Sequence, residues 1–268
     1  MAEERISDLV QQVQSNAKYR FITPEIVQRL VEDALRRELR GKQAVKDVRN
    51  KLHQIGGAYF KKTPNFHFWQ SKLIDLPSDP AHPAVRDFCK DAMHTHASTA
   101  ERIPILETFF HACLDSIAPV SSVLDLACGL NPLALSWMPL AKDCSYHACD
   151  IYLDMLQLVA VFFNHLGIDG SAEPCDLVSG LVGPKAQVAF LLKSIPCLEQ
   201  IDKSVALPLL RSIPSKHILV SFPVRSLGGL RKGMPGFYRD HFYAMVMGEG
   251  WQIKEFSFST ELAFLVTK

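Results

Sequence analysis

The chain has 268 residues, of which 48% are hydrophobic and 21% are charged, and its mean hydropathy is +0.06. This composition is typical of a soluble globular protein and excludes a disordered or fibrous one. The length predicts one large domain, or one domain with a small appendage. No apolar run approaches the roughly 18 residues that cross a bilayer, and the acidic start MAEERISDLV lacks the apolar core of a signal peptide. We therefore expect a cytoplasmic protein that does not associate with membranes.

The net charge of +1 hides a basic segment near the N-terminus. Between Arg36 and Lys62 there are nine Lys/Arg but only two acidic residues, Glu38 and Asp47. Such a segment indicates a phosphate-binding appendage, although a solvated helix face explains the charge equally well. If the phosphate-binding interpretation holds, nucleic-acid contacts are expected in this segment and in a later glycine-rich stretch, from Arg36, Arg37, Arg40, Lys42, Lys46, Arg49, Lys61, Lys62, Arg225, Arg231 and Lys232.

The first quarter of the chain has the apolar spacing of short helices. Thr23-Pro24 is a helix-start signal, and Gly56-Gly57 ends the helix that carries much of the basic segment. Residues 64–83 are rich in aromatics and proline, which predicts a connector packed against the next domain. We predict a helical domain over residues 1–75 and a second domain over residues 76–268, entered by a helix at about 98–117.

Strands and helices alternate after Pro119, which predicts a mostly parallel α/β sheet covered on both faces. The last two strand-like runs are joined by a short polar link, so an antiparallel hairpin is expected to close the sheet. The expected strands are 122–126, 146–149, 188–192, 217–222, 251–258 and 261–266, with helices at 154–166 and 203–212.

A strand, a carboxylate and a small-residue turn follow one another in VLDLACGLNP, residues 123–132. Ligands of open α/β sheets lie at the carboxyl ends of the strands, where a glycine lets the backbone approach closely. Only Gly129 is present, so the three-glycine dinucleotide fingerprint is missing. Asp150 ends the next strand, about where a ribose is held, and Asp176 follows a weakly indicated third strand. A lone carboxylate at a strand end often only caps a helix, but Asp125, Asp150 and Asp176 at successive strand ends indicate an adenosine site.

The seven cysteines are odd in number and form no C-x-x-C pair, so we expect neither a disulfide framework nor a zinc ribbon. His94, His96 and His111 have no third partner in the sequence pattern, so we predict no metal site.

Three segments together resemble one enzyme family: HASTAERIP at 96–104, DLACGLNPLAL at 125–135 and LLKSIPCLEQ at 191–200. The chain resembles, over its whole length, the aminoglycoside-resistance 16S rRNA guanine-N7 methyltransferases that modify nucleotide 1405. The resemblance implies a class I Rossmann-like methyltransferase sheet with a small α-helical N-terminal domain. It also implies S-adenosylmethionine as cofactor, S-adenosylhomocysteine as product and 16S rRNA in the 30S subunit as partner. We expect a monomer without a protein partner. Ala127 departs from the wider superfamily, where glycine is commoner.

The same resemblance implies a role for each matching residue. Arg102 would pair with the methionine carboxylate; from the sequence alone it fits a surface ion pair with Glu101 or Glu107 equally well. Lys193 would position the target base, although a lysine that ends a strand is commonly only solubilising. The cofactor residues implied are His96, Arg102, Asp125, Ala127, Gly129, Asp150, Ile151, Asp176 and Leu177.

Two alternatives share the expected fold. One is a small-molecule methyltransferase, which would need no basic appendage. The other is a non-catalytic RNA-binding protein, which would need no intact cofactor pocket.

Methyl transfer to guanine N7 needs no general base, because N7 carries a free lone pair and no proton. The absence of an obvious His/Asp or Cys/His dyad in the sequence is consistent with that reaction.

Overall fold

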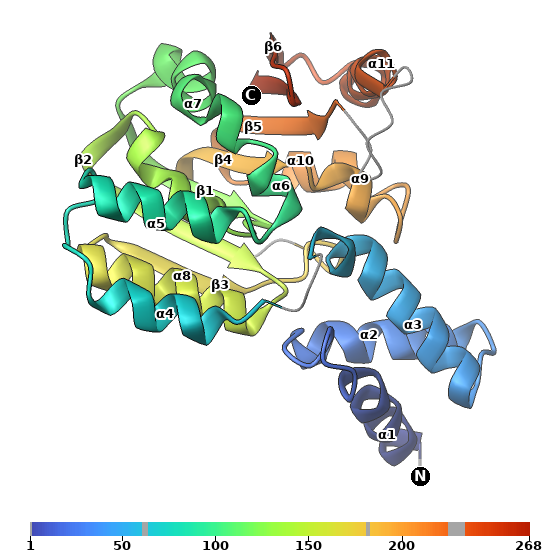
Figure 1. The fold of residues 1–268 in the computed structure, drawn as a ribbon. Coiled ribbons are helices and arrows are strands. Elements are labelled where there is room, and N and C mark those ends of the chain that lie inside the picture. Colours follow the sequence, from blue (N-terminus) through green and yellow to red (C-terminus); the bar gives the residue numbers. More distant parts are fainter. Residues whose placement is uncertain (1, 61–63, 181–182, 225–233) are drawn as a thin grey trace.

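The structure is a computed structural model that describes residues 2–60, 64–180, 183–224 and 234–268. Three helices form the N-terminal part, α1 (Ala2–Gln14), α2 (Pro24–Arg36) and α3 (Gly41–Ile55). As predicted, Pro24 begins a helix and Gly56 ends one. The three helices lie together at one end of the molecule, beside the larger part of the chain (Figure 1). None of the described helices has the length and apolar character that crossing a bilayer requires.

The larger part contains a seven-stranded sheet in the order β3-β2-β1-β4-β5-β7-β6. The first five strands are parallel, and β7 runs antiparallel to both β5 and β6. The predicted parallel sheet with its antiparallel C-terminal hairpin is thus confirmed. The strands are β1 (Val120–Leu126), β2 (Leu140–Asp150), β3 (Gly170–Pro174), β4 (Ala186–Leu192), β5 (Ser215–Pro223), β6 (Gln252–Ser257) and β7 (Glu261–Thr267).

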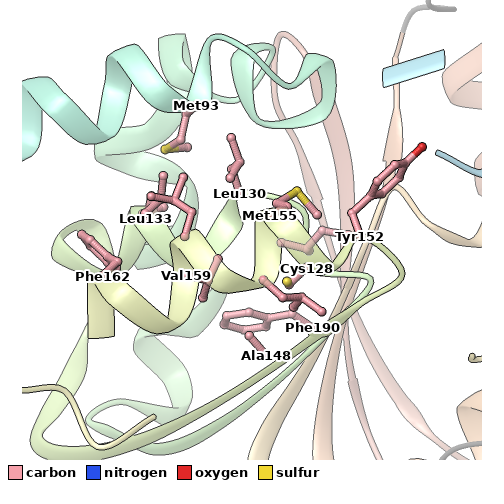
Figure 2. Packing of buried hydrophobic residues seen from close by; sticks show 14 of the residues in the cluster. Met93, Cys128, Leu130, Leu133, Ala148, Tyr152, Met155, Val159, Phe162 and Phe190 are labelled. Atoms are coloured by element: carbon pink, nitrogen blue, oxygen red, sulfur yellow. The ribbon is translucent and has the colours of Figure 1, made fainter. Parts of the chain in front are cut away.

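Helices cover both faces of this sheet, because alternate side chains of the central strands enter two separate apolar clusters. Val123 belongs to one cluster and Leu124 to the other. Figure 2 shows the first cluster, where Met155 and Val159 lie close to Ala148 and Phe190 of the strands. The first face carries α4 (Phe66–Ile74), α5 (Pro83–Met93), α7 (Leu106–Leu114) and α8 (Leu153–Leu166), and the second carries α9 (Ile195–Leu198), α10 (Ala206–Ser212) and α11 (Met234–Val246).

Two local expectations differ from the structure. The helix expected at 98–117 is broken into α6 (Ala97–Ala100), a 3-10 turn at Ile103–Ile105, α7 and a second 3-10 turn, because Pro104 has no backbone N–H to continue a helix. The expected connector contains α4, which packs against α8. Because α4 packs against α8, which covers the sheet, we propose that the boundary between the two parts falls before Phe66 rather than near residue 75.

The helical part is attached to the sheet at the carboxyl ends of the strands. Thr23 donates its backbone N–H to the Ile151 carbonyl (3.0 Å), and Leu153 donates to the Phe21 carbonyl (2.8 Å). At Gly56, a Cβ atom would lie 2.6 Å from the Tyr152 ring, so only glycine permits this close approach. These contacts place the start of α2 and the end of α3 against the strand ends where the candidate site lies.

Candidate active site

A cleft lies between the helical part and the carboxyl ends of β1, β2, β3 and β4. It encloses about 770 Å³ of space free of protein atoms, counting its open mouth, which is within the range of small-molecule sites. Its wall combines apolar side chains with a few polar groups. Of the predicted site residues, seven line it: His96, Ala127, Asp150, Ile151, Asp176, Leu177 and Lys193.

Asp150 is held by backbone donors at the end of β2. Its Oδ2 accepts from the Gly129 N–H (2.9 Å), and its Oδ1 accepts from the Ile151 N–H (2.6 Å). Burial raises the pKa of Asp150, and the backbone N–H groups oppose that rise. The Tyr152 N–H also donates to Oδ1 (3.4 Å), so three backbone donors fix the carboxylate in the cleft wall and about one acceptor site remains for a ribose hydroxyl.

The turn after β1 adopts left-handed backbone at two positions, Ala127 (φ +51°) and Gly129 (φ +53°). A Cβ at Gly129 would lie 2.7 Å from Cε1 of His96, so the space requires a glycine here, and the left-handed backbone also favours one. Gly129 lies behind the cleft wall, where it supports His96. The Nδ1 atom of His96 is buried without a hydrogen-bond partner among the described residues. Burial, with the charges of Arg102 and Lys193, lowers the pKa of His96 to about 3, so the ring is neutral.

Asp125 lies behind the turn and does not line the cleft. Its Oδ2 accepts hydrogen bonds from the Tyr146 hydroxyl (2.6 Å) and from the Asn131 amide (2.8 Å). Burial raises the pKa of Asp125 to about 7, against the lowering effect of those hydrogen bonds. Its observed contacts are structural, and its expected contact with the cofactor remains a prediction.

Arg102 is also behind the cleft, in a buried ionic network. Its Nε and Nη2 donate to the two carboxylate oxygens of Glu261 (3.1 and 2.7 Å), and its Nη1 donates to Asn131 (2.8 Å). Arg102 is 1% exposed, so the alternative of a surface ion pair with Glu101 or Glu107 is wrong. The pairing of Arg102 with a methionine carboxylate stays a prediction, since two guanidinium nitrogens of Arg102 donate to Glu261 in this structure.

Lys193 joins the same network from the end of β4. Its Nζ donates to Glu101 (2.8 Å) and lies 3.4 Å from Glu261, and the residue is only 3% exposed. The reading of Lys193 as a solubilising surface lysine is therefore wrong. Burial acts to raise the pKa of Glu261, but Arg102 and Lys193 hold it below its ordinary value. Positioning of the target base by Lys193 remains a prediction.

Asp176 follows β3 and meets the helical part. Arg29 of α2 donates to both of its carboxylate oxygens, from Nε (2.5 Å) and from Nη2 (3.1 Å). Leu177, beside it, is buried in the cleft wall. Arg29 thus connects the basic helical part with a predicted cofactor residue.

The structure describes six of the eleven residues predicted to contact RNA. Lys42, Lys46 and Arg49 line a shallow hollow between α1 and α3, where both lysines are exposed. Arg36, Arg37 and Arg40 are exposed near the junction of α2 and α3. Lys61, Lys62, Arg225, Arg231 and Lys232 lie outside the described residues.

Several residues of the site were not anticipated from the sequence. Arg29 and Glu261 find their partners far along the chain, so no local spacing marks them. Only Glu261 left a signal in the sequence: it opens the apolar run ELAFLV, and a carboxylate in a buried strand needs a partner. The structure also joins Cys149 and Cys175 in a disulfide, although no framework was expected. Each of these cysteines directly precedes a cleft carboxylate, Asp150 or Asp176.

The sheet order, the antiparallel β7 and the cleft at the strand ends define a class I S-adenosylmethionine-dependent methyltransferase. The residues fit an adenosyl group, because a carboxylate fixed by backbone donors, Asp150, lines a largely apolar cleft together with Leu177 and Ile151. The chain belongs to the ribosomal RNA methyltransferase (FmrO) family, whose model matches residues 15–265.

Relatives match nearly the whole chain. Proteins named 16S rRNA (guanine(1405)-N(7))-methyltransferase are 34% identical in Frankia casuarinae (99% of this chain, 95% of the relative) and 32% in Serratia marcescens (98% of each). Among solved structures, the 16S rRNA methyltransferase RmtF in complex with S-adenosylhomocysteine has a TM-score of 0.83 at 30% identity, covering 99% of this chain and 98% of that one. The 16S rRNA methylase RmtB has a TM-score of 0.80 at 27% identity, covering 98% of each.

Gly129→Ala tests the turn. We expect a loss of about 1–3 kcal/mol in the free energy of unfolding, because the substitution adds backbone strain and a contact with His96. Chemical denaturation measures the loss, and calorimetry should show weaker binding of S-adenosylhomocysteine. Gly167→Ala is the matched control, since Gly167 has a φ of +64° and open space around its Cβ position. Equal losses in the two variants would contradict a role for the His96 contact.

Asp125→Asn tests the buried carboxyl. The folded pKa of about 7 exceeds the ordinary value of 3.8, so this group's contribution to stability is complete below the ordinary value and is lost as pH rises through about 7. Between about pH 5 and pH 8, we expect the wild type to lose on the order of 1 kcal/mol or more relative to Asp125→Asn. Urea unfolding across that range measures the difference, and parallel pH profiles would refute the raised pKa.

Proposed function

We propose that this protein transfers the methyl group of S-adenosylmethionine to N7 of guanine 1405 in 16S rRNA, within the assembled 30S subunit, and thereby confers aminoglycoside resistance. The observation that carries the proposal is the cleft itself. Its lining joins the fixed Asp150 carboxylate to residues of the helical part, in a chain whose full-length relatives bear that activity in their names.

Each part of the cleft has a proposed role toward the cofactor. Asp150 accepts from the ribose hydroxyls, while Asp176 and Leu177 hold the adenine amino group and ring. Ala127 and Ile151 form the adjoining wall, and His96 offers its Nδ1 atom. Arg102 and Lys193 stabilise the back of the site through Glu261, and we assign to them the pairing with the methionine carboxylate and the positioning of the target base, respectively.

The chemistry requires orientation rather than proton transfer. Bound S-adenosylmethionine supplies an electrophilic methyl group on a sulfonium, and guanine N7 supplies the lone pair that attacks it. No proton leaves N7, so the neutral His96 and the ion-paired Lys193 need not act as bases. The residues contribute by aligning the two reactants and excluding water, which can account for a large part of a rate enhancement.

The RNA must be recognised mainly by its shape. A stacked guanine has to leave its helix before N7 can enter the cleft, which costs a few kcal/mol that phosphate contacts must offset. The exposed cations gather around the junction of α2 and α3, at the end of the helical part that points away from the sheet, where they can make phosphate contacts outside the cleft. A small-molecule substrate would not need this surface.

Expression of the protein in susceptible bacteria tests the reaction. We expect mass spectrometry of 16S rRNA to show 7-methylguanosine at position 1405, together with resistance to kanamycin and gentamicin. Asp150→Asn should reduce the modification at least about tenfold, because a buried charge-assisted contact to the ribose is lost. Asp143→Asn, on the exposed part of the same strand, is the control. Unmodified rRNA with the folded wild type would contradict the proposal.

Charge reversal at Lys42 and Lys46 tests the docking surface. The double variant Lys42→Glu/Lys46→Glu should bind 30S subunits at least about tenfold more weakly, because two phosphate contacts become repulsive. Binding of S-adenosylhomocysteine, measured by calorimetry, should stay the same. Lys142→Glu on β2 is the matched control. Unchanged affinity of the double variant for 30S subunits would contradict docking by this hollow.

A further inference from the structure

The Asp176 carboxylate already accepts four hydrogen bonds. Its Oδ2 accepts from Arg29 Nε (2.5 Å) and from the Ser179 hydroxyl (2.8 Å). Its Oδ1 accepts from Arg29 Nη2 (3.1 Å) and from the Val178 N–H (3.1 Å). An ionised carboxylate offers about four lone-pair sites, so this one has no free site for a further donor.

The proposed function assigns this same carboxylate to the adenine amino group, which is also a donor. One of the present donors must therefore give up its place when the amino group binds. Val178 and Ser179 are held there by the local turn, two and three residues after Asp176. Arg29 reaches the carboxylate from α2, on a long side chain that is 25% exposed. The Ser179 hydroxyl can also rotate away, but Ser179 does not line the cleft and Arg29 does, so Arg29 is the displaceable donor that an adenine in the cleft meets.

We propose that Arg29 competes with the adenine amino group for Asp176 and so sets the affinity of the cleft for its cofactor. The inference rests on the proposed adenine contact and goes beyond it, because it assigns a role in cofactor binding to a residue of the basic helical part. Arg29 lines the cleft beside Asp176 and Leu177, so its guanidinium lies at the adenine end.

Arg29 has other partners within reach when it leaves. Glu25 and Glu32 lie four residues before and three residues after it on α2, which is the spacing that brings side chains together on a helix surface. Water also reaches the exposed part of Arg29. Displacing Arg29 from Asp176 therefore leaves no buried charge without a partner, and the free energy that cofactor binding loses is moderate.

Competition predicts a gain of affinity when the competitor is removed. Arg29→Met keeps an unbranched apolar side chain but has no donor, so S-adenosylhomocysteine should bind about tenfold more tightly, the scale of one charged hydrogen bond near solvent. The analogue of S-adenosylhomocysteine in which hydrogen replaces the adenine amino group should bind the wild type and Arg29→Met equally. Arg29→Lys, which retains one donor group, should fall between them. Calorimetry with both compounds measures the effect.

Two further variants test whether the gain of affinity in Arg29→Met acts through Asp176. In an Asp176→Asn background, Arg29→Met should have no additional effect, which shows that Arg29 acts through that carboxylate. Arg211→Met, which removes an exposed ion pair with Glu249, is the matched control and should bind like the wild type. Thermal unfolding without added compound confirms that each variant is folded.

The results distinguish the competition from the proposed function. Unchanged or weaker binding of S-adenosylhomocysteine to folded Arg29→Met overturns the competition alone. An equal gain for the compound without the amino group also overturns it, because Arg29 would then act on another part of the cofactor. Failure of the wild type to bind S-adenosylhomocysteine overturns both proposals.

Discussion

The structure behind the cleft depends on the interactions of one buried carboxylate, that of Glu261. It lies at the start of β7 and binds Arg102, which precedes the sheet, Lys193 at the end of β4, and Ser221 of β5. Removing one partner of such a group leaves a buried charge uncompensated, which typically costs about 3–5 kcal/mol. Replacing all of these charged side chains with apolar ones of similar volume often leaves the free energy of unfolding unchanged. The network therefore contributes mainly to the orientation of the strands. It fixes three strand ends relative to one another.

The network also determines the charge of the site. Arg102 and Lys193 are each paired with a glutamate, and His96 is neutral, so the buried cations are balanced where they lie. The unbalanced buried charge that faces the cleft belongs to Asp150. A site of this kind favours a positively charged sulfonium donor. His96, whose pKa is lowered to about 3, is a weak base, which suits a reaction that removes no proton.

The sequence predicted those features that depend on local patterns. The alternation of apolar strands with helices predicted that Asp150 and Asp176 lie at the same edge of the sheet, and both line the cleft there. The single glycine of the turn after β1 adopts left-handed backbone. Pairings across long distances in the chain were not predictable, because Arg29 and Asp176 are 147 residues apart and carry no shared motif. The helix α4 was missed since aromatics and prolines dominated its segment. Whether Arg102 and Asp125 touch the cofactor is likewise a matter of three-dimensional contacts that no spacing encodes.

The basic segment contributes fewer available charges than its composition suggests. Arg37 binds Asp47, and Lys51 binds Asp33. Arg40 donates to the carbonyls of Leu35 and Leu39, and Arg49 donates to carbonyls of α1. Those cations hold the three helices together and are partly neutralised before any nucleic acid arrives. Fewer condensed counterions would then leave the ribosomal RNA on association, so binding should weaken less steeply with ionic strength than a simple count of lysines and arginines implies.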